Sequence, residues 1–184
     1  MKRKSLAVAA LMGLAVMSAV AGMKNPMVGG QEMYPTKNII ENAVNSADHT
    51  TLVAAVKAAG LVETLEGAGP FTVFAPTNEA FNKLPAGTVD TLVKPENKAT
   101  LTKILTYHVV AGRVSSHELL KKIKEGKGSA ELTTVEGGKL TATVVDGKHI
   151  QLKDEKGGTS MVTIADVFQS NGVIHVVDTV LMPN

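Results

Sequence analysis

The spacing of hydrophobic residues changes partway along the chain. Between residues 36 and 123 the apolar residues recur mostly at intervals of three and four, which is typical of amphipathic helices. After Gly128 they alternate with polar residues, which favours strands. One early apolar run, starting at Phe71, also reads as a strand. Helices first, strands last and one early strand predict an α+β domain over residues 35–184.

Capping residues indicate where the helices begin and end. Thr36 is expected to cap a helix whose apolar face includes Ile39 and Ile40. Asp48 is expected to cap a second helix, which stops at Gly60. Ser115 and Glu118 match a capping box. A further helix is predicted after Pro95, and Leu101, Ile104, Leu105 and His108 share its apolar face.

Turn signals divide the second half into strands. Gly137-Gly138 and Asp146-Gly147 are two-residue hairpin signals, and Asn171-Gly172 separates the last two strands. The run "VIHVVDTVL" is apolar at nearly every position, which predicts a strand covered on both faces. The strands are expected at residues 132–135, 140–145, 149–152, 160–168 and 173–181.

The first 21 residues have the pattern of a secretory signal peptide. A basic start, Lys2 to Lys4, precedes an uncharged apolar stretch and the small residues Ala19-Val20-Ala21. Residues 22–34 lack apolar periodicity and are predicted to be a flexible leader. Met23, Met27 and Met33 lie in this leader, where thioethers could bind Cu(I). The alternative is that these methionines have no common role.

Removing the signal peptide changes the charge balance. The chain has 19 basic and 17 acidic residues, and loss of Lys2, Arg3 and Lys4 leaves 16 against 17. Such a balance gives no reason to expect nucleic acid as a partner. The absence of cysteine excludes disulfides, thiol catalysis and a lipid-bearing cysteine at the cleavage site. We expect a secreted protein, extracellular or periplasmic, that is monomeric or weakly associating and not inserted in the membrane.

The sequence does not match the common motifs of catalysis or of metal binding. No phosphate-binding loop or nucleophile elbow is present. His117-Glu118 begins like a zinc-protease helix, but Lys121 stands where the second histidine would be. No cofactor or metal is therefore predicted. His108 and His175 lie among apolar residues and are interpreted as buried histidines held by hydrogen bonds, with a ligand or switch role as the alternative.

Three motifs give the sequence a specific resemblance. "FTVFAPTNEAFNKLP" at residues 71–85, "YHVVAGRV" at 107–114 and "NGVIHVVDTVLMP" at 171–183 occur in this order. They resemble the first signature, the central Tyr-His motif and the second signature of the fasciclin-like domain family. The resemblance implies a β-wedge of two sheets flanked by several helices. It also implies that residues 71–85 are mainly structural, with Thr77 capping the next helix.

The resemblance also implies a function and candidate binding residues. Family members act in adhesion or interaction outside the cell, without established catalysis. Tyr107-His108 matches the motif linked to adhesion. Asp166 resembles the aspartate of an Asp-Ile integrin-recognition motif of animal members, although Val167 follows it here. The alternative interpretation of Asp166 is a strand-end cap or turn.

Two functions follow from these observations. The first is a secreted, non-catalytic adhesion module for a surface, matrix or protein partner. The second is a small-molecule-binding or hydrolytic protein with a cleft near Tyr107 and His108. A deep pocket would favour the second, and a shallow surface the first. Helical phase predicts that His108 is buried and that Tyr107 shows more of its ring to a partner.

Overall fold

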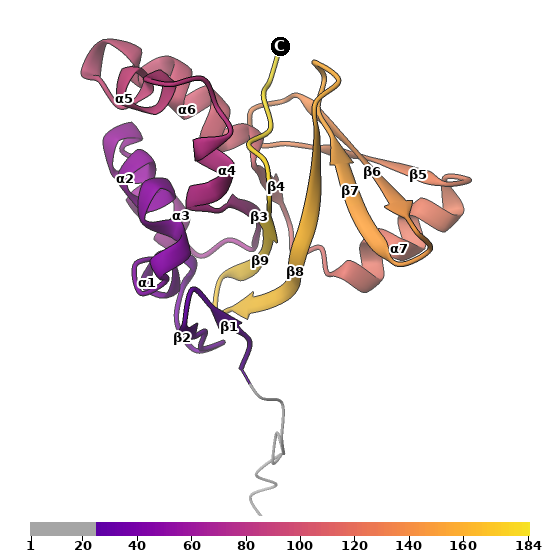
Figure 1. The fold of residues 1–184 in the computed structure, drawn as a ribbon. Helices are drawn as coiled ribbons and strands as arrows, with labels where there is room; N and C mark the ends of the chain where they lie inside the picture. Colours follow the sequence, from indigo (N-terminus) through magenta and orange to yellow (C-terminus); the bar gives the residue numbers. More distant parts are fainter. Residues whose placement is uncertain (1–24) are drawn as a thin grey trace, which may run out of the picture.

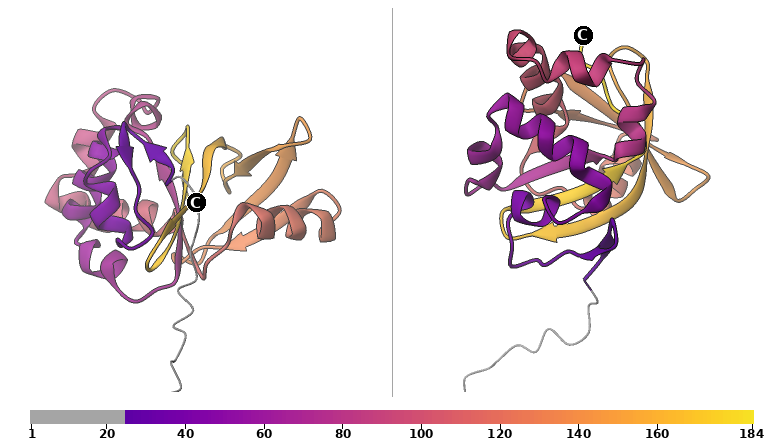
Figure 2. Two further views of the ribbon diagram at one scale, coloured as in Figure 1. Left: turned by 90° about the horizontal axis from the view of Figure 1, so that it is seen from below. Right: turned by 60° about the vertical axis from the view of Figure 1, so that its left-hand side comes forward.

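A mixed β-sheet separates two layers of the molecule. The computed structural model describes residues 25–184, so the predicted signal peptide (1–21) and Met23 lie outside the described residues. Helices α1 to α6 gather on one side of the central strands, and strands β5 to β7 with helix α7 lie on the other (Figure 1). The view from below shows these two layers diverging from the central strands as a wedge (Figure 2).

The helices are short and precede most of the strands. The α-helices are α1 (Ile39–Ala43), α2 (Thr50–Ala59), α3 (Val62–Glu66), α4 (Asn78–Asn82), α5 (Thr88–Leu92), α6 (Lys98–Tyr107) and α7 (Ser116–Glu125). Two 3-10 helices, η1 (Ala47–His49) and η2 (Pro95–Asn97), lead into α2 and α6. The sequence did not predict α3 and α5, since one helical turn or so is too short to show a periodic apolar face.

Seven strands form one continuous sheet in the order β4-β3-β9-β8-β7-β6-β5. They are β3 (Phe71–Pro76), β4 (Val109–Ala111), β5 (Ser129–Thr133), β6 (Lys139–Val145), β7 (His149–Lys153), β8 (Thr159–Gln169) and β9 (Gly172–Val177). Strands β3 and β9 are parallel and the other pairs antiparallel. The two sheets of the expected wedge share β8, whose pairing with β9 shifts register twice between Val162 and Val167. The α+β fold class is confirmed.

The last strand ends earlier than its apolar pattern predicts. Strand β9 stops at Val177, and residues 178–184 continue without regular structure. Val180 and Leu181 are nevertheless buried. Apolar character here marks burial in a crossing segment rather than a strand, a distinction that hydrophobicity alone does not make.

Two helix caps differ from the prediction. The cap of α1 is not Thr36 but Asn38, two residues later, which forms a capping box with Glu41. Helix α2 begins at Thr50, and Asp48 lies in η1 without capping it. Instead, the Thr51 N–H donates to the side-chain oxygen of Asn78 at 3.0 Å. The caps at Thr77 and Ser115 and the left-handed stop at Gly60 are as predicted.

Residues 25–34 form a hairpin on the helical layer rather than a flexible leader. Strand β1 (Met27–Val28) pairs with β2 (Gln31–Glu32). Val28 and Met33 are buried, and Met27 is 58% exposed. The Ala47 N–H donates to the Gly29 carbonyl, which holds the hairpin tip against η1. Burial of two apolar side chains supplies the energy that orders this segment. Met27 and Met33 therefore differ in exposure, which does not favour a shared copper site.

The sheet has a hydrophobic core on each face. The helical-layer core includes Val73, Ala75 and Ile174 together with residues of α1 to α6. The wedge core includes Phe74, Tyr107 and Val177 together with residues of α7 and β5 to β8. Because successive residues of a strand point to opposite faces, β3 contributes Val73 and Ala75 to one core and Phe74 to the other. Strand β3 is thus the wall between the two cores.

Candidate interaction site

Tyr107 anchors the wedge core and does not reach the surface. It ends helix α6 and is 0% exposed. Its hydroxyl donates to the Lys139 carbonyl at 2.7 Å and accepts from the Glu155 N–H at 3.2 Å. Burial raises the pKa of this phenol to about 12. The expectation that Tyr107 shows its ring to a partner is wrong, because hairpin residues far along the sequence cover the face of α6 that periodicity left open.

His108 is buried and joins α6 to the C-terminal segment. It is 2% exposed. Its Nε2 lies 3.0 Å from the Leu181 N–H, and its Nδ1 lies 2.8 Å from the Ile104 carbonyl. Since the amide donates to Nε2, the ring proton sits on Nδ1 and is donated to Ile104. Burial lowers the pKa of His108 to about 4. This agrees with the prediction of a buried, hydrogen-bonded neutral histidine.

Asp166 lies at the bend of β8 and connects this strand to helix α7 by hydrogen bonds. Its backbone is left-handed, with φ of 58°. Its carboxylate accepts from the Ser116 N–H at 2.7 Å and also from the Ser116 hydroxyl. The backbone N–H of Asp166 donates to Nδ1 of His175, whose Nε2–H donates to the Val114 carbonyl at 2.8 Å. Asp166 therefore accepts from the first residue of α7, a helix whose N-cap is Ser115, and it lies within β8 rather than at the strand end that its cap-or-turn interpretation named. No hydrogen bond of the described residues joins it to Tyr107 or His108.

A buried polar residue that sequence reasoning missed, Asn171, helps to hold the helical layer together. Asn171 accepts from the Ile39 N–H at 3.0 Å and donates to the carbonyls of Leu65 and Gly67 at 2.6 and 2.9 Å. It thus ties α1 and α3 to the start of β9. Before the fold was known, Asn171 indicated only a turn, since its partners lie more than 100 residues away.

The C-terminal segment is fixed by a buried carboxylate. Asp154 follows β7 and is 7% exposed. It accepts from the Gly158 N–H at 2.6 Å and from the Met182 N–H at 3.0 Å. The sequence indicated only a polar loop here. Together with His108, Asp154 ties residues 181 and 182 back to the sheet.

The arrangement offers little for catalysis or metal binding. Tyr107 and His108 use their polar atoms on backbone groups, which leaves none free for a substrate. Across residues 25–184, no three His, Cys, Asp or Glu side chains gather so that they could hold a metal ion. At the position predicted for the hydrolytic alternative, neither Tyr107 nor His108 is thus free to act as a nucleophile or a base.

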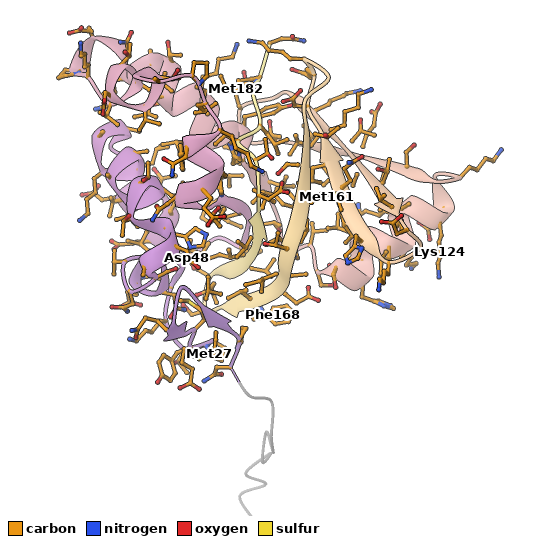
Figure 3. The ribbon with its side chains drawn as sticks, viewed as in Figure 1. Met27, Asp48, Lys124, Met161, Phe168 and Met182 are labelled. Carbon is orange, nitrogen blue, oxygen red and sulfur yellow. The ribbon has the colours of Figure 1, made fainter. Side chains whose placement is uncertain are left out.

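Exposed apolar side chains occur where the hairpin meets the end of β8. Met27, Tyr34 and Phe168 are 58%, 40% and 40% exposed. Asn42 donates both to the Tyr34 carbonyl and to the Gln169 side chain, so Tyr34, two residues after β2, and the end of β8 lie at the same end of the domain. Figure 3 shows Met27 and Phe168 at this end. We call Met27, Tyr34 and Phe168 the hairpin-end surface.

Comparison with known proteins places this architecture in a family. The Fasciclin domain family model matches residues 47–183. Protein sll1483 from Synechocystis sp. is 47% identical over 160 residues, which cover 87% of this chain and 81% of that protein. The cell surface glycolipoprotein MPB83 from Mycobacterium bovis is 38% identical over 166 residues, which cover 90% of this chain and 64% of that protein.

A solved structure supports the same fold. The FAS1 domain pair from the insect cell adhesion molecule Fasciclin I aligns with a TM-score of 0.69 and 19% identity, over 79% of this chain and 51% of that chain. The molecule is thus an α+β wedge domain with a core on each face of a mixed sheet. The chain belongs to the fasciclin domain family.

Proposed function

We propose that this protein is a non-catalytic interaction domain that works outside the cytoplasm and adheres to a surface, matrix or protein partner. The names of similar proteins support this, one a cell surface glycolipoprotein and one a cell adhesion molecule. The predicted signal peptide supports the location. Within the described residues, no helix has both the length and the apolar character needed to cross a bilayer.

The observation that carries the proposal is the contrast between the motif residues and the hairpin-end surface. Tyr107 and His108 are buried and stabilise the fold. Met27, Tyr34 and Phe168 instead expose apolar area, and aromatic and methionine side chains are enriched in protein interfaces. We therefore assign partner contact to the hairpin-end surface, and we assign to Tyr107, His108 and Asp166 the support of the scaffold that presents it.

Binding to native cell-envelope fragments tests the proposal. Immobilised domain should retain the fragments, and the double variant Met27→Ser with Phe168→Ser should lose at least about tenfold in retention, as expected when central apolar contacts are removed. Val135→Ser is the matched control, because Val135 is also apolar and 47% exposed but follows β5. Equal retention by both variants and wild type would contradict the assignment.

The hydrolytic alternative has its own readout. The purified domain should not turn over a panel of simple esters. Turnover that disappears in His108→Gln, while the folded fraction is unchanged, would favour the alternative over adhesion.

A further inference from the structure

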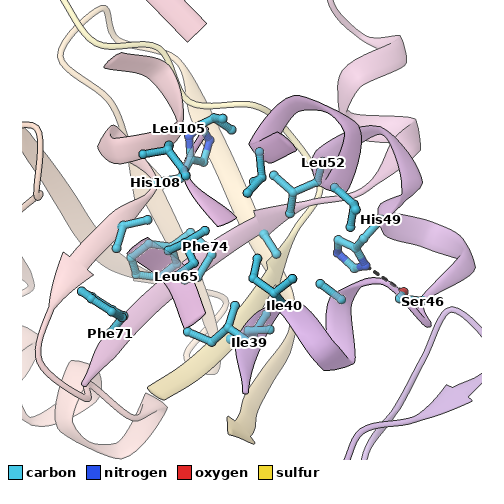
Figure 4. A pocket seen from close by; sticks show the side chains of 18 of the residues that line it. Ile39, Ile40, Ser46, His49, Leu52, Leu65, Phe71, Phe74, Leu105 and His108 are labelled. Carbon is cyan, nitrogen blue, oxygen red and sulfur yellow. Dashed lines mark hydrogen bonds between the residues drawn. The ribbon is translucent and has the colours of Figure 1, made fainter. Parts of the chain in front are cut away.

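A cavity lies between the helical layer and the sheet. Its volume is about 60 Å³. Figure 4 shows its wall, made by side chains from α1, α2, β3 and the end of α6. Most of the lining is aliphatic or aromatic, and it includes Ile39, Ile40, Leu52, Val56, Val73 and Ile174. Val28 and Met33 of the hairpin also line it, so the hairpin covers part of the space.

One polar side chain in this wall has an unused hydrogen-bonding atom. His49 is 3% exposed, and its Nδ1 lies 2.9 Å from the Ser46 hydroxyl. Its Nε2 is the single buried side-chain nitrogen or oxygen of the described residues that lacks a hydrogen-bond partner. A buried polar atom without a partner costs about 1–3 kcal/mol. The other polar lining residues are Ser46, Thr64, Thr106 and His108, and none of them has a buried side-chain atom without a partner. An unpaired atom among these mostly apolar residues points to a ligand rather than to packing alone.

The surroundings of His49 define which kind of atom it would receive. Burial lowers the pKa of His49, while the Ala75 backbone and Asp48 raise it less. The ring is therefore neutral near pH 7. The Ala75 carbonyl favours a proton on Nε2, although it forms no hydrogen bond of normal geometry. With the proton on Nε2, the Ser46 hydroxyl donates to Nδ1, and Nε2–H has no partner of hydrogen-bond geometry.

We propose that this cavity binds a small, neutral, largely apolar molecule whose single hydrogen-bond acceptor receives the Nε2–H of His49. No Asp, Glu, Lys or Arg lines the cavity, so a charged ligand would lose its hydration without compensation. A buried water needs about 10–15 Å³ and two to four polar partners. By that measure the space holds roughly four to six heavy atoms, while His49 supplies only one donor.

Two isosteric probes separate the apolar and polar parts of the proposal. 2-Butanone carries a carbonyl, and 2-methyl-1-butene has a methylene group in place of that oxygen. Both have five heavy atoms. Titrated into the folded protein, 2-butanone should give saturable shifts of the Ile39 and Ile40 methyl signals in NMR spectra. It should also shift the His49 Nε2–H signal downfield and bind about tenfold more tightly than the alkene, as one added hydrogen bond to an unpaired donor implies.

Matched variants locate the binding. Ala43 lines the cavity, so Ala43→Leu should fill it and abolish the shifts. Ala47→Leu makes the same substitution at an exposed position outside the lining and should leave binding unchanged. His49→Leu should remove the preference for the ketone.

If a variant fails to fold, titration of the wild-type protein with the two probes still tests the proposal. Absence of saturable shifts with either probe would overturn the proposal. Equal affinity for the two probes, with the His49 signal unmoved, would also overturn it, because Nε2 would then not receive the acceptor.

Discussion

The two cores meet at β3 yet satisfy their polar groups differently. In the wedge core the Tyr107 hydroxyl is paired on both sides, by the Lys139 carbonyl and the Glu155 N–H. In the helical-layer core Nε2 of His49 has no hydrogen-bond partner, and His49 lines a cavity. The wedge core is therefore the more completely specified of the two, since a fully paired polar group favours one arrangement. The packing of the helical layer around His49 is less tightly constrained by hydrogen bonds.

Tyr107 and His108 divide between these two environments, although they are neighbours in the sequence. Tyr107 belongs to the wedge core, while His108 lines the cavity of the helical layer. The Tyr-His motif thus connects the cores through the last turn of α6. Because both residues are buried, we propose that the motif acts by stabilising the fold rather than by direct contact with a partner.

The largest expected effect is loss of the Tyr107 ring. Tyr107→Ala should lower the free energy of unfolding by about 3–5 kcal/mol, because it removes a large buried aromatic side chain. Tyr107→Phe keeps the ring but strands two backbone groups and should cost about 1–3 kcal/mol. Denaturant midpoints measure both. Helical phase alone, which predicts that Tyr107 shows more of its ring to a partner, would give a smaller loss. Wild-type stability of Tyr107→Ala would show that the wedge core does not depend on its anchor.

Acid should weaken the protein through its buried histidines. Burial lowers the pKa of His49, His108 and His175 in the folded state. Between pH 6.5 and about 4 the unfolded chain therefore binds protons that the folded chain excludes, so stability is full above pH 6.5 and falls as the pH drops. For His108 the change from 6.5 to about 4 corresponds to about 3 kcal/mol.

Denaturant unfolding at pH 7, 5.5 and 4.5 measures this effect. His108→Gln should be less stable at pH 7 but should lose less on acidification than wild type. An unchanged pH dependence in that variant would mean that His108 is not the main titrating group.

Local features of the fold were predictable where their cause is local. The capping box at Ser115 and Glu118 and the stop at Gly60 depend on residues within one helical turn, and both are present. The prediction that Asp48 caps α2 failed because Asn78, in the first signature motif, accepts from the Thr51 N–H instead. A cap supplied across 27 residues leaves no spacing signal beside the helix.

The candidate site was less predictable for the same reason. Burial of His108 followed from the phase of α6, which periodicity shows. Burial of Tyr107 did not, because the covering groups belong to Lys139 and Glu155 in later hairpins. No sequence pattern indicated that Nε2 of His49 is unpaired. That property depends on the absence of a partner from other parts of the fold.

The hairpin offers a smaller, local test of the helical layer. Gly29 has φ of 59°, and a Cβ there would lie 2.5 Å from the Ser46 hydroxyl and 2.7 Å from the Ala47 nitrogen. Gly29→Ala should cost about 1–3 kcal/mol and loosen the hairpin. Gly30→Ala is the control, because Gly30 has φ of 75° but no atom within 4 Å of the added Cβ. It should cost roughly 1 kcal/mol from backbone strain alone.

Amide exchange of Met33 reports on the hairpin, since its N–H is bonded to the Pro26 carbonyl. Exchange should speed up more in Gly29→Ala than in Gly30→Ala. Equal exchange in the two variants would show that contact with η1 does not hold the hairpin in place.

The smallest expected effect concerns Asp166, where the two layers meet at the bend of β8. Asp166→Ala removes both bonds to Ser116 and should cost about 1 kcal/mol, the usual cost of losing a helix cap. Asp166→Asn keeps an acceptor for the Ser116 N–H and tolerates the left-handed backbone. Its NH2 group replaces the oxygen that accepts from the Ser116 hydroxyl, so that bond must reverse its direction. With the bond reversed, the variant should lose mainly the charge interaction with the helix end, about 0.3–1 kcal/mol. Thermal melts compare the two variants, and amide exchange in the first turn of α7 locates the change. If Asp166 acted instead as a partner contact, both variants would lose envelope binding while the α7 amides exchanged as in wild type.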